Sequence, residues 1–190
     1  MVEITTQRKL FAHELGDILY VERKLATEVL PKLIDEVRDA ELRRGLQKHH
    51  QETKRHVRNV EKAFQKLGEE PEVEPCLGFE GLKREHDKLL SEASPSLTTA
   101  VDAGAAARTE HYEIAAYQGL IAMARGLGER EIVPLLDANL KDERAALREV
   151  EKVSRRLAKE NGGPRSSNGR RRSSRRRTTA ARGKRATTRT

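Results

Sequence analysis

The sequence predicts an all-α fold, a four-helix bundle with one long crossover connection that contains a short fifth helix. Four long segments repeat apolar residues with the period of an amphipathic helix, and no segment shows the alternation of a convincing strand. Two connections between these segments are short, and the third is long and holds three prolines. This pattern is typical of bundles with a single crossover, although an up-down bundle with an irregular loop has the same composition.

The first two helices are expected to form a hairpin. The first covers about residues 7–36, and Pro31 can kink it because proline has no amide hydrogen to donate. The second begins after Asp39, whose carboxylate can accept hydrogen bonds from the free amides of the first turn. It should stop before Gly68, since glycine readily adopts the left-handed conformation that ends helices.

The last two helices are expected to form a second hairpin. The third runs from about Leu97 to Arg125 and ends at the Gly-Leu-Gly sequence of residues 126–128. The fourth runs from near Glu129 to about Glu160, with Pro134 close enough to its first turn to be tolerated.

The long connection, residues 69–96, holds a short amphipathic segment. Its apolar residues Phe79, Leu82 and Leu89 predict a minor fifth helix that packs on the bundle. The folded region should end at the Asn-Gly-Gly-Pro sequence of residues 161–164. We therefore expect one bundle domain over residues 1–163.

Charge and composition separate a C-terminal tail from the bundle. Residues 165–190 hold 11 Arg or Lys and no Asp or Glu, which leaves 27 basic and 30 acidic residues, a net charge of −3, in residues 1–164. The apolar residues of this segment are three alanines, so it cannot bury enough surface to offset the entropy cost of ordering. Residues 164–190 are therefore predicted to be a disordered Arg-rich tail.

The tail is predicted to bind DNA or RNA without sequence preference. Its arginine runs suit phosphate contacts, and it has no aromatic side chains on which bases could stack. A solubilising extension is the other interpretation, but eleven cations without an anion exceed what solubility requires. The predicted nucleic-acid contacts are Arg170, Arg171, Arg172, Arg175, Arg176, Arg177, Arg182, Lys184 and Arg185.

Composition also excludes some classes of protein. The single Cys76 cannot form an internal disulfide, and the N-terminal residues lack the pattern of a signal peptide. No window approaches the roughly 18 consecutive apolar residues that a membrane-spanning helix requires. We expect a cytoplasmic protein, associated with the nucleoid if the tail binds DNA.

Acidic residues occupy the centre of the apolar stripe in all four helices. In the first helix, for example, Glu22 lies between Ile18 and Leu25 on a stripe that is otherwise apolar. In the second helix the central glutamate is flanked by two histidines on the same face. The candidate metal ligands are Glu22, His49, Glu52, His56, Glu110, Glu113 and Glu143.

The spacing of these glutamates predicts that they share one layer. Glu22 and Glu52 are 30 residues apart, as are Glu113 and Glu143, and each midpoint falls in a short predicted turn. Residues equidistant from the turn of an antiparallel helix pair lie at the same height. Each pair should therefore meet about 22 Å from its hairpin end.

A layer of buried carboxylates requires positive charge, because removing each charge from water costs several kcal/mol. Two metal ions, with iron as the first candidate and manganese as the second, would supply this charge. The alternative is a network in which arginines such as Arg108 and Arg144 turn inward and pair with the glutamates. A third interpretation is that the helix faces are misjudged and the glutamates are exposed.

Four segments resemble the YciE/YciF family of ferritin-like bacterial stress proteins, and the resemblance covers about residues 5–160. They are LFAHELGDILYVERKL (10–25), HHQETKRHVRNV (49–60), CLGFEGL (76–82) and EHYEIAAYQGL (110–120). The resemblance implies a ferritin-like bundle, usually a homodimer, with a dinuclear metal site.

The resemblance also implies which residues are metal ligands. They are Glu22 in the first helix, His49 and Glu52 in the second, Glu110 and Glu113 in the third and Glu143 in the fourth. His56 stands where relatives have Gln or His. Other ferritin-like oxidases commonly place His three residues after Glu, whereas Arg55 and Ala146 follow Glu52 and Glu143 here. This departure indicates an oxygen-rich site that suits iron or manganese.

Two functions are compatible with these features. The first is a stress-response protein that binds two metal ions, oxidises Fe(II) with O2 or peroxide, and is tethered to nucleic acid by its tail. The second is a DNA-associated structural dimer whose carboxylates are paired with arginine and which has no catalytic activity.

Overall fold

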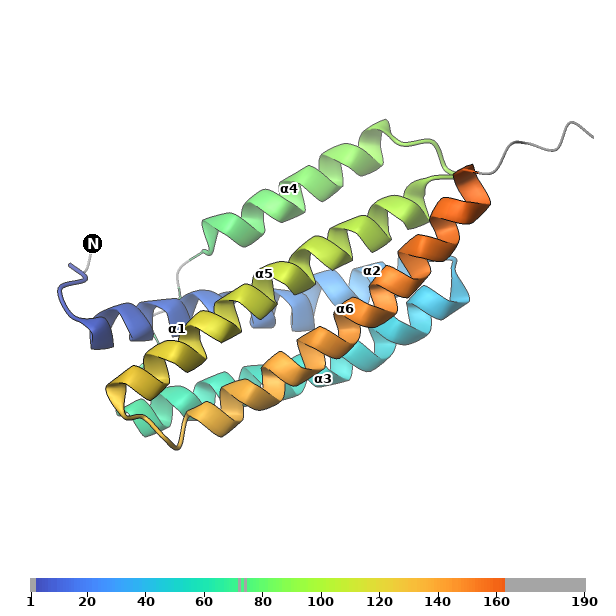
Figure 1. Ribbon diagram of the computed structural model, residues 1–190. Helices are drawn as coiled ribbons and strands as arrows, with labels where there is room; N and C mark the ends of the chain where they lie inside the picture. Colours follow the sequence, from blue (N-terminus) through green and yellow to red (C-terminus); the bar gives the residue numbers. More distant parts are fainter. Residues whose placement is uncertain (1–2, 72, 74, 163–190) are drawn as a thin grey trace, which may run out of the picture.

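The computed structural model describes residues 3–71, 73 and 75–162, and it confirms the predicted all-α four-helix bundle with one long crossover (Figure 1). The described residues contain no strand. Within them, the helical segments are α1 (Gln7–Lys24), η1 (Leu25–Val29), α2 (Leu30–Glu36), α3 (Ala40–Leu67), α4 (Leu77–Glu92), α5 (Thr98–Leu127) and α6 (Val133–Gly162).

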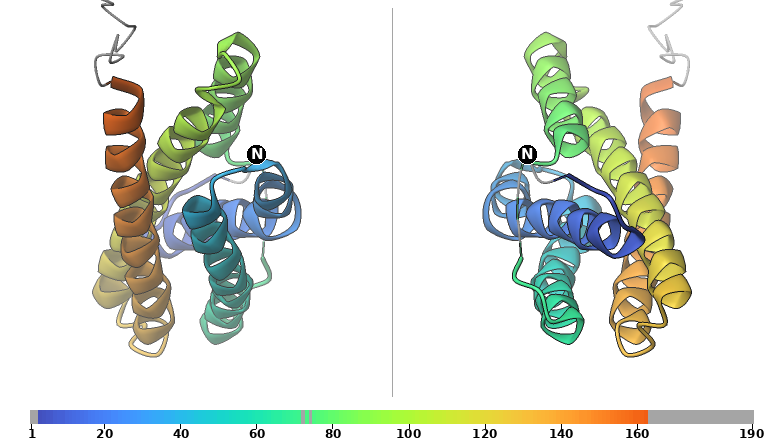
Figure 2. Two further views of the ribbon diagram at one scale, coloured as in Figure 1. Left: turned by 90° about the vertical axis from the view of Figure 1, so that its right-hand side faces the viewer. Right: turned by 90° about the vertical axis from the view of Figure 1, so that its left-hand side faces the viewer.

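The bundle consists of two helix hairpins packed side by side. One hairpin pairs the continuous rod α1-η1-α2 with α3, and the other pairs α5 with α6 (Figure 1). In cross-section α1 packs against α3 and α5, and α6 packs against the same two helices. The end-on views of Figure 2 show this arrangement and place α4 outside it, against α5. The helix α4 carries the chain from the end of α3 to the opposite end of the bundle (Figure 1).

Capping residues explain where the helices begin and end. The Asp39 carboxylate accepts hydrogen bonds from the amides of Glu41 at 3.1 Å and Leu42 at 2.9 Å, which fixes the start of α3. Gly68 and Gly128 follow α3 and α5 with φ of 72° and 78°, the left-handed conformation that glycine adopts without strain. The expected bounds of the second helix are confirmed.

The first rod contains a π-helical turn, η1, which ends two residues before Pro31. The sequence predicted one helix that could kink at this proline. The amide of Leu30 donates to the carbonyl of Leu25, five residues earlier. Pro31 has no amide to donate to the Ala26 carbonyl, which accepts a hydrogen bond from Nε2 of His50 at 2.8 Å. The irregularity therefore lies one turn before the proline and is held from α3.

The fourth predicted helix begins later than expected, at Val133 and not near Glu129. Residues 129–132 form a tight turn in which the amide of Ile132 donates to the carbonyl of Glu129 at 3.1 Å. Pro134 is consequently the second residue of α6, a position where its missing amide costs no helical hydrogen bond.

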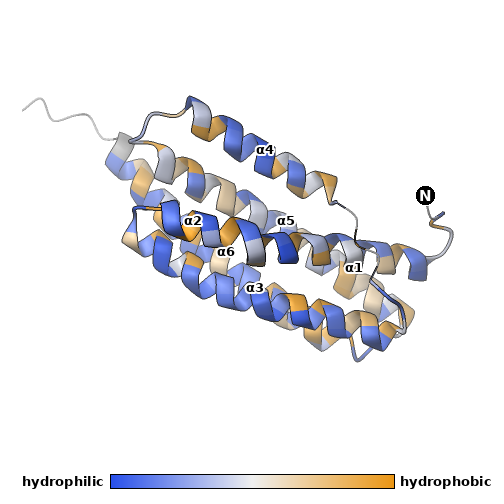
Figure 3. Cartoon of the chain, turned by 180° about the vertical axis from the view of Figure 1, so that it is seen from behind, coloured by the Kyte–Doolittle hydropathy of each residue, from blue (hydrophilic) through white to orange (hydrophobic). Residues whose placement is uncertain are grey.

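Apolar residues fill the space between the four rods and also lie under α4. Phe11, Leu15, Leu120 and Leu136 are among the buried side chains of this core. Polar and apolar residues alternate along each helix in Figure 3, as expected for helices that bury one face. None of the described helices combines the length and the hydropathy needed to cross a membrane.

Two predictions are not tested by the structure. The Arg-rich tail, including all the predicted nucleic-acid contacts from Arg170 to Arg185, lies outside the described residues. The structure contains one chain, so the homodimer stays a prediction.

Candidate metal centre

The middle of the bundle contains two overlapping groups of buried residues whose donor atoms converge. The donor atoms of each group all lie within 4.8 Å of one another. The first donor group is His49, Glu110, Glu113 and Glu143, and the second donor group is Glu22, His56 and Glu143. Glu143 belongs to both groups, so the two groups form one continuous cluster.

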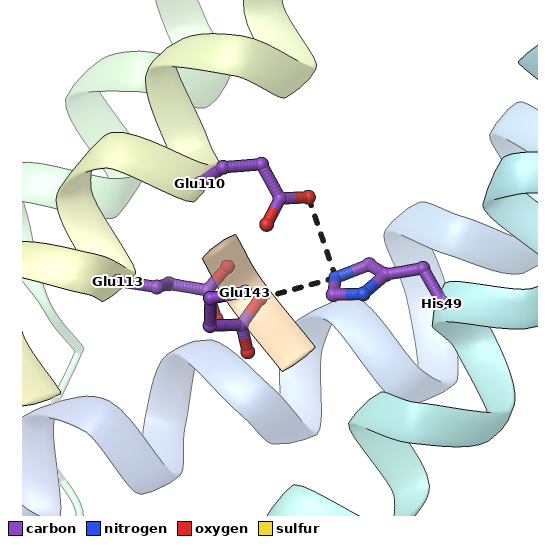
Figure 4. Close-up of side chains that lie close together, drawn as sticks. All are labelled: His49, Glu110, Glu113 and Glu143. Atoms are coloured by element: carbon purple, nitrogen blue, oxygen red, sulfur yellow. Dashed lines mark ion pairs between the residues drawn. The ribbon is translucent and has the colours of Figure 1, made fainter. Parts of the chain in front are cut away.

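In the first donor group, carboxylates from α5 and α6 face an imidazole from α3 (Figure 4). Nε2 of His49 lies 3.4 Å from Oε1 of Glu110 and 3.6 Å from Oε2 of Glu143. Glu113, one helical turn after Glu110, points into the same space (Figure 4). Three helices therefore direct oxygen and nitrogen atoms at one point.

In the second donor group, His56 of α3 lies between glutamates from α1 and α6. Its Nδ1 is 3.2 Å from Oε1 of Glu22 and 2.8 Å from Oε1 of Glu143. All three side chains are fully buried. The two oxygens of Glu143 therefore face the two histidines separately, Oε1 toward His56 and Oε2 toward His49.

The donor atoms of this cluster are largely without hydrogen bonds among the described residues. Both carboxylate oxygens of Glu113 and of Glu143 are buried with no hydrogen-bond partner there, and so is one oxygen each of Glu22 and Glu110. Nδ1 of His56 also lacks a bond of acceptable geometry. Buried polar atoms are nearly always satisfied in folded proteins, so such a concentration indicates a ligand that binds them together. Carboxylate oxygens and imidazole nitrogens are the donors that iron and manganese accept, and the residues present fit such ions.

Burial and mutual repulsion oppose ionisation of the carboxyl groups in the cluster. Burial raises the pKa of Glu113 well above its ordinary value, and the charges of Glu143, Glu22 and Glu110 raise it further. Burial also raises the pKa values of Glu110 and Glu22, although His56 partly offsets the effect on Glu22. A multivalent cation would remove both the desolvation cost and the repulsion.

His56 supplies positive charge to the metal-free cluster. Burial by itself would lower the pKa of His56, but the carboxylates of Glu22 and Glu143 raise it to about 10. Burial pushes the pKa of Glu143 upward, and the two imidazoles outweigh this effect and hold it below its ordinary value. A proton on Nδ1 of His56 thus occupies the place that a metal ion would take.

Neighbouring side chains fix the orientation of the second donor group. Tyr117 donates a short hydrogen bond to Oε1 of Glu22. Nδ2 of Asn139 donates to the Tyr117 hydroxyl at 2.9 Å and to the backbone carbonyl of His56 at 3.3 Å. Such outer contacts commonly hold metal ligands in place and tune their affinity.

Asp142 orients the imidazole of His56 from the opposite side. Its Oδ2 lies 3.3 Å from Nε2 of His56 and also pairs with Arg55. The α6 helix turns the Asp142 carboxylate toward α3 and away from open solvent. A hydrogen on Nε2 directed at this carboxylate leaves Nδ1 free to bind a metal ion.

Six of the seven predicted ligands lie in the cluster, and Glu52 lies at its edge. One oxygen of Glu52 is 3.3 Å from Nζ of Lys48, and the other is 3.8 Å from Nδ1 of His49. Its side chain is 13% exposed, whereas the side chains of Glu113 and Glu143 are fully buried. Glu52 therefore contacts His49 from outside, much as Asp142 contacts His56.

The prediction that Glu22 lies against Glu52 is wrong, because Glu22 contacts His56. Side chains on a helix lean toward its N-terminus. The Glu22 side chain on α1 therefore leans away from the hairpin end, and side chains on α3 lean toward it. The partner of Glu22 is consequently one turn farther along α3 than equal counting predicts.

The described residues place no arginine or lysine against the buried carboxylates of the cluster. Arg108, named as a possible partner, lies 3.2 Å from Glu85 on α4, and Arg144 is exposed. Histidines are the basic groups within 4.0 Å of Glu22, Glu110 and Glu143 in this part of the chain. The arginine-paired network is therefore not favoured by the structure.

Sequence reasoning missed Tyr117, Asn139 and Asp142 as supports of the cluster. Polar residues on the inward stripes one turn from a candidate ligand were the available signal for Tyr117 and Asn139. Tyr20 and Tyr112, which are close in sequence to Glu22 and Glu113, have partners outside the cluster. The Tyr20 hydroxyl donates to Glu80 at 2.7 Å, and the Tyr112 hydroxyl lies 2.9 Å from Sγ of Cys76.

Two cavities reach the first donor group. A cleft of about 330 Å³ between α3 and α6 is lined by His49, Glu52 and Glu110 among others. A smaller cavity of about 60 Å³ lies beneath α4, is mostly apolar, and reaches His49, Glu110 and Glu113. The cluster is thus accessible on two sides through spaces of different chemistry.

Comparisons with known proteins agree with this fold. Residues 6–162 match the family model described as "Domain of unknown function (DUF892)". Protein YciF of Escherichia coli strain K12 is 27% identical over 146 residues, which are 76% of this chain and 87% of YciF. The crystal structure of the E. coli stress protein YciF has a TM-score of 0.75 and 25% identity, covering 82% of this chain and 98% of that one. YcfI from Rhodopseudomonas palustris has a TM-score of 0.75 and 36% identity, covering 78% and 95%.

Proposed function

The chain belongs to the DUF892 family, the YciE/YciF family that its sequence resembles, and on that premise we propose that it is a stress-response protein that binds two metal ions inside its bundle. The proposed ions are iron or, as the second candidate, manganese. The stress role is suggested by the description of YciF as a stress protein.

One observation carries the proposal of a metal site. Buried oxygen and nitrogen atoms from four helices converge without hydrogen-bond partners among the described residues. A structural carboxylate network would satisfy most of these atoms, since a buried unpaired polar group costs about 1–3 kcal/mol. A protein that keeps many unpaired buried polar groups in one layer gains a site for a cation and loses stability in exchange.

Two ions are proposed because the donors form two groups that share Glu143. His49, Glu110 and Glu113 would hold one ion, and Glu22 and His56 the other. The carboxylate of Glu143 supports both sites with its separate oxygens. Bound iron would supply the capacity to exchange electrons with O2 or peroxide, and oxidation of Fe(II) is the activity that we propose.

The residues of the chain prepare this site before any ion binds. Tyr117 holds Glu22 in place, and Asp142 holds Nε2 of His56 so that Nδ1 faces the centre. The apolar core around the buried side chains lowers the local dielectric, which strengthens the attraction between carboxylates and a cation. These are the properties of a preformed site.

Metal analysis tests this proposal. The purified protein, loaded anaerobically with Fe(II) or with Mn(II) and desalted, should retain about two ions per chain. Glu143→Gln should lose both ions because its carboxylate serves both groups. Glu151→Gln, the same change on the more exposed side of α6, is the matched control and should retain both. Normal folding with no retained metal in the unmodified protein would contradict the proposal.

We propose further that the tail tethers the protein to nucleic acid. Eleven basic and no acidic residues in 165–190 support phosphate contacts, each of which contributes about 0.9 to the slope of log affinity against log salt on duplex DNA. A chain that stops at residue 164 should therefore lose salt-dependent binding to a mixed-sequence duplex. Equal retention of DNA by the full and shortened chains would contradict the tether.

A further inference from the structure

The cleft between α3 and α6 is shaped by a glycine. Gly45 lies in the second turn of α3, inside the helix, where glycine is less favourable than alanine. A Cβ at this position would meet Oε2 of Glu149 at 3.6 Å, an ordinary contact, and no other described atom within 4 Å. The absence of a side chain at Gly45 therefore leaves space in the cleft wall. The backbone conformation at this position does not require glycine.

The inner end of the cleft consists of candidate metal ligands. His49 and Glu110 line it, and both side chains are more than nine-tenths buried. Oε2 of Glu110 and Nδ1 of His49 have no hydrogen-bond partner among the described residues. The cleft thus connects the surface with unsatisfied donors of the first donor group.

The outer end of the cleft consists of charged side chains. Nζ of Lys48 lies 3.3 Å from Oε1 of Glu52 and 3.6 Å from Oε1 of Glu149, so it bridges α3 and α6 across the opening. The Lys48 side chain is 51% exposed and can move into solvent. Glu52 has one oxygen toward this lysine and the other toward His49, which places it between the opening and the cluster.

We propose that this cleft is the route by which a divalent cation reaches the buried cluster, with Glu52 as the first carboxylate that binds it and Lys48 as the cation that it displaces. This inference rests on the proposed function, because it assumes that the cluster binds metal. The carboxylates of Glu52 and Glu149 attract a hydrated cation, and Gly45 leaves room for it to pass.

The cavity under α4 is less suited to this role. Apolar residues form most of its wall, Thr109 adds a neutral hydroxyl, and Lys83 and His86 are its basic residues outside the cluster. Neither offers a negative charge to a hydrated cation, whereas the α3-α6 cleft offers Glu52 and Glu149. The two cavities therefore make different predictions for variants that narrow them.

The test is the rate of Co(II) binding to the full-length protein, followed by stopped-flow absorbance, together with its equilibrium stoichiometry. Gly45→Leu fills the cleft and should slow association and dissociation by the same factor, at least about tenfold, without changing the number of ions bound. The association and dissociation rates should change by the same factor, because a change in the entry route does not alter the equilibrium affinity for Co(II). Lys48→Met should speed association several-fold because it frees both carboxylates.

Matched controls exclude indirect effects. Gly119→Leu changes a glycine on the exposed face of α5, where a Cβ would meet no described atom within 4 Å, and should leave the rates unchanged. Ala106→Leu narrows the cavity under α4 and should also leave them unchanged.

The outcomes separate this inference from the proposed function. No Co(II) bound by the unmodified protein would overturn both. Normal stoichiometry with unchanged rates in Gly45→Leu would overturn the route and leave the metal site standing. If Gly45→Leu does not fold, Lys48→Met decides, and an association rate equal to that of the unmodified protein would overturn the route.

Discussion

Nδ1 of His56 lies 2.8 Å from Oε1 of Glu143, in a layer of the bundle where both side chains are fully buried. The other oxygen of Glu143 faces His49 at 3.6 Å, so one carboxylate joins two imidazoles that are two turns apart on α3. A proton on His56 neutralises part of the cluster when metal is absent. A metal ion must displace that proton, and binding should therefore release protons to the solvent.

Replacing Glu113 by methionine should stabilise the metal-free protein. Both oxygens of Glu113 are buried without a hydrogen-bond partner in the described part of the chain, and methionine removes that cost at similar volume. We expect the free energy of unfolding to rise by about 1–3 kcal/mol in urea denaturation after chelation. The same variant should bind less metal.

The control for this variant is Glu151→Met on α6, which should change stability by no more than about 0.5 kcal/mol. A Glu113→Met protein that is less stable than the unmodified one would show that the carboxylate is satisfied in the metal-free state.

Removing the hydroxyl of Tyr117 should weaken metal binding through Glu22. In Tyr117→Phe, Oε1 of Glu22 loses its donor and Nδ2 of Asn139 loses one acceptor. Stability should fall by about 1–3 kcal/mol, and metal affinity in equilibrium dialysis by about 10–100-fold. Tyr20→Phe removes a bond to Glu80 outside the cluster and should leave affinity unchanged. Equal affinity of both variants would exclude a role for Tyr117 in positioning Glu22.

Asp39 should contribute stability that depends on pH. Burial would raise the pKa of Asp39, but hydrogen bonds from the Leu42 amide and from Arg156 outweigh this effect and lower it. A lowered folded-state pKa means that the contribution is present above the unfolded pKa of about 3.9 and is lost as pH falls through the folded value. Asp39→Ala should therefore cost about 1 kcal/mol at pH 7 and progressively less below pH 4.

Denaturant unfolding of both proteins between pH 7 and pH 3 measures this difference. A gap that stays constant over the whole range would mean that the charge of Asp39 does not matter and that its effect is steric.

His50 and Pro31 should be energetically coupled through the Ala26 carbonyl. His50→Ala leaves this carbonyl without its donor and should cost about 1 kcal/mol. In a Pro31→Ala background the amide of residue 31 can donate to the same carbonyl, so the cost should be smaller by about 0.5 kcal/mol or more. A double-mutant cycle by urea denaturation measures the coupling, and strict additivity would contradict it.

The fold could be predicted from the sequence because its determinants are local. The carboxylate of Asp39 caps α3, and glycines at 68 and 128 end α3 and α5 where periodicity stops. The π-helical turn could not be predicted in the same way. It is accompanied by a contact between His50 and the Ala26 carbonyl, and residues so far apart in the sequence give no local signal for it.

The composition of the site could be predicted better than its contacts. A charged residue in an apolar stripe is visible in the sequence, and Glu22, Glu113 and Glu143 are buried as expected. The contacts between these residues depend on the direction in which each side chain points along its helix and on helix register. Glu22 therefore contacts His56, and Glu52 lies at the edge of the cluster. The position of Asp142 required the packing of α6 on α3, which no local pattern encodes.

Anomalous diffraction from crystals of the protein loaded with Mn(II) tests the central claim most directly. The account predicts two anomalous peaks within bonding distance of Glu143, one beside His49 with Glu110 and the other beside His56 with Glu22. A well-ordered bundle in excess Mn(II) with no peak at Glu143, or with peaks confined to surface carboxylates, would contradict it.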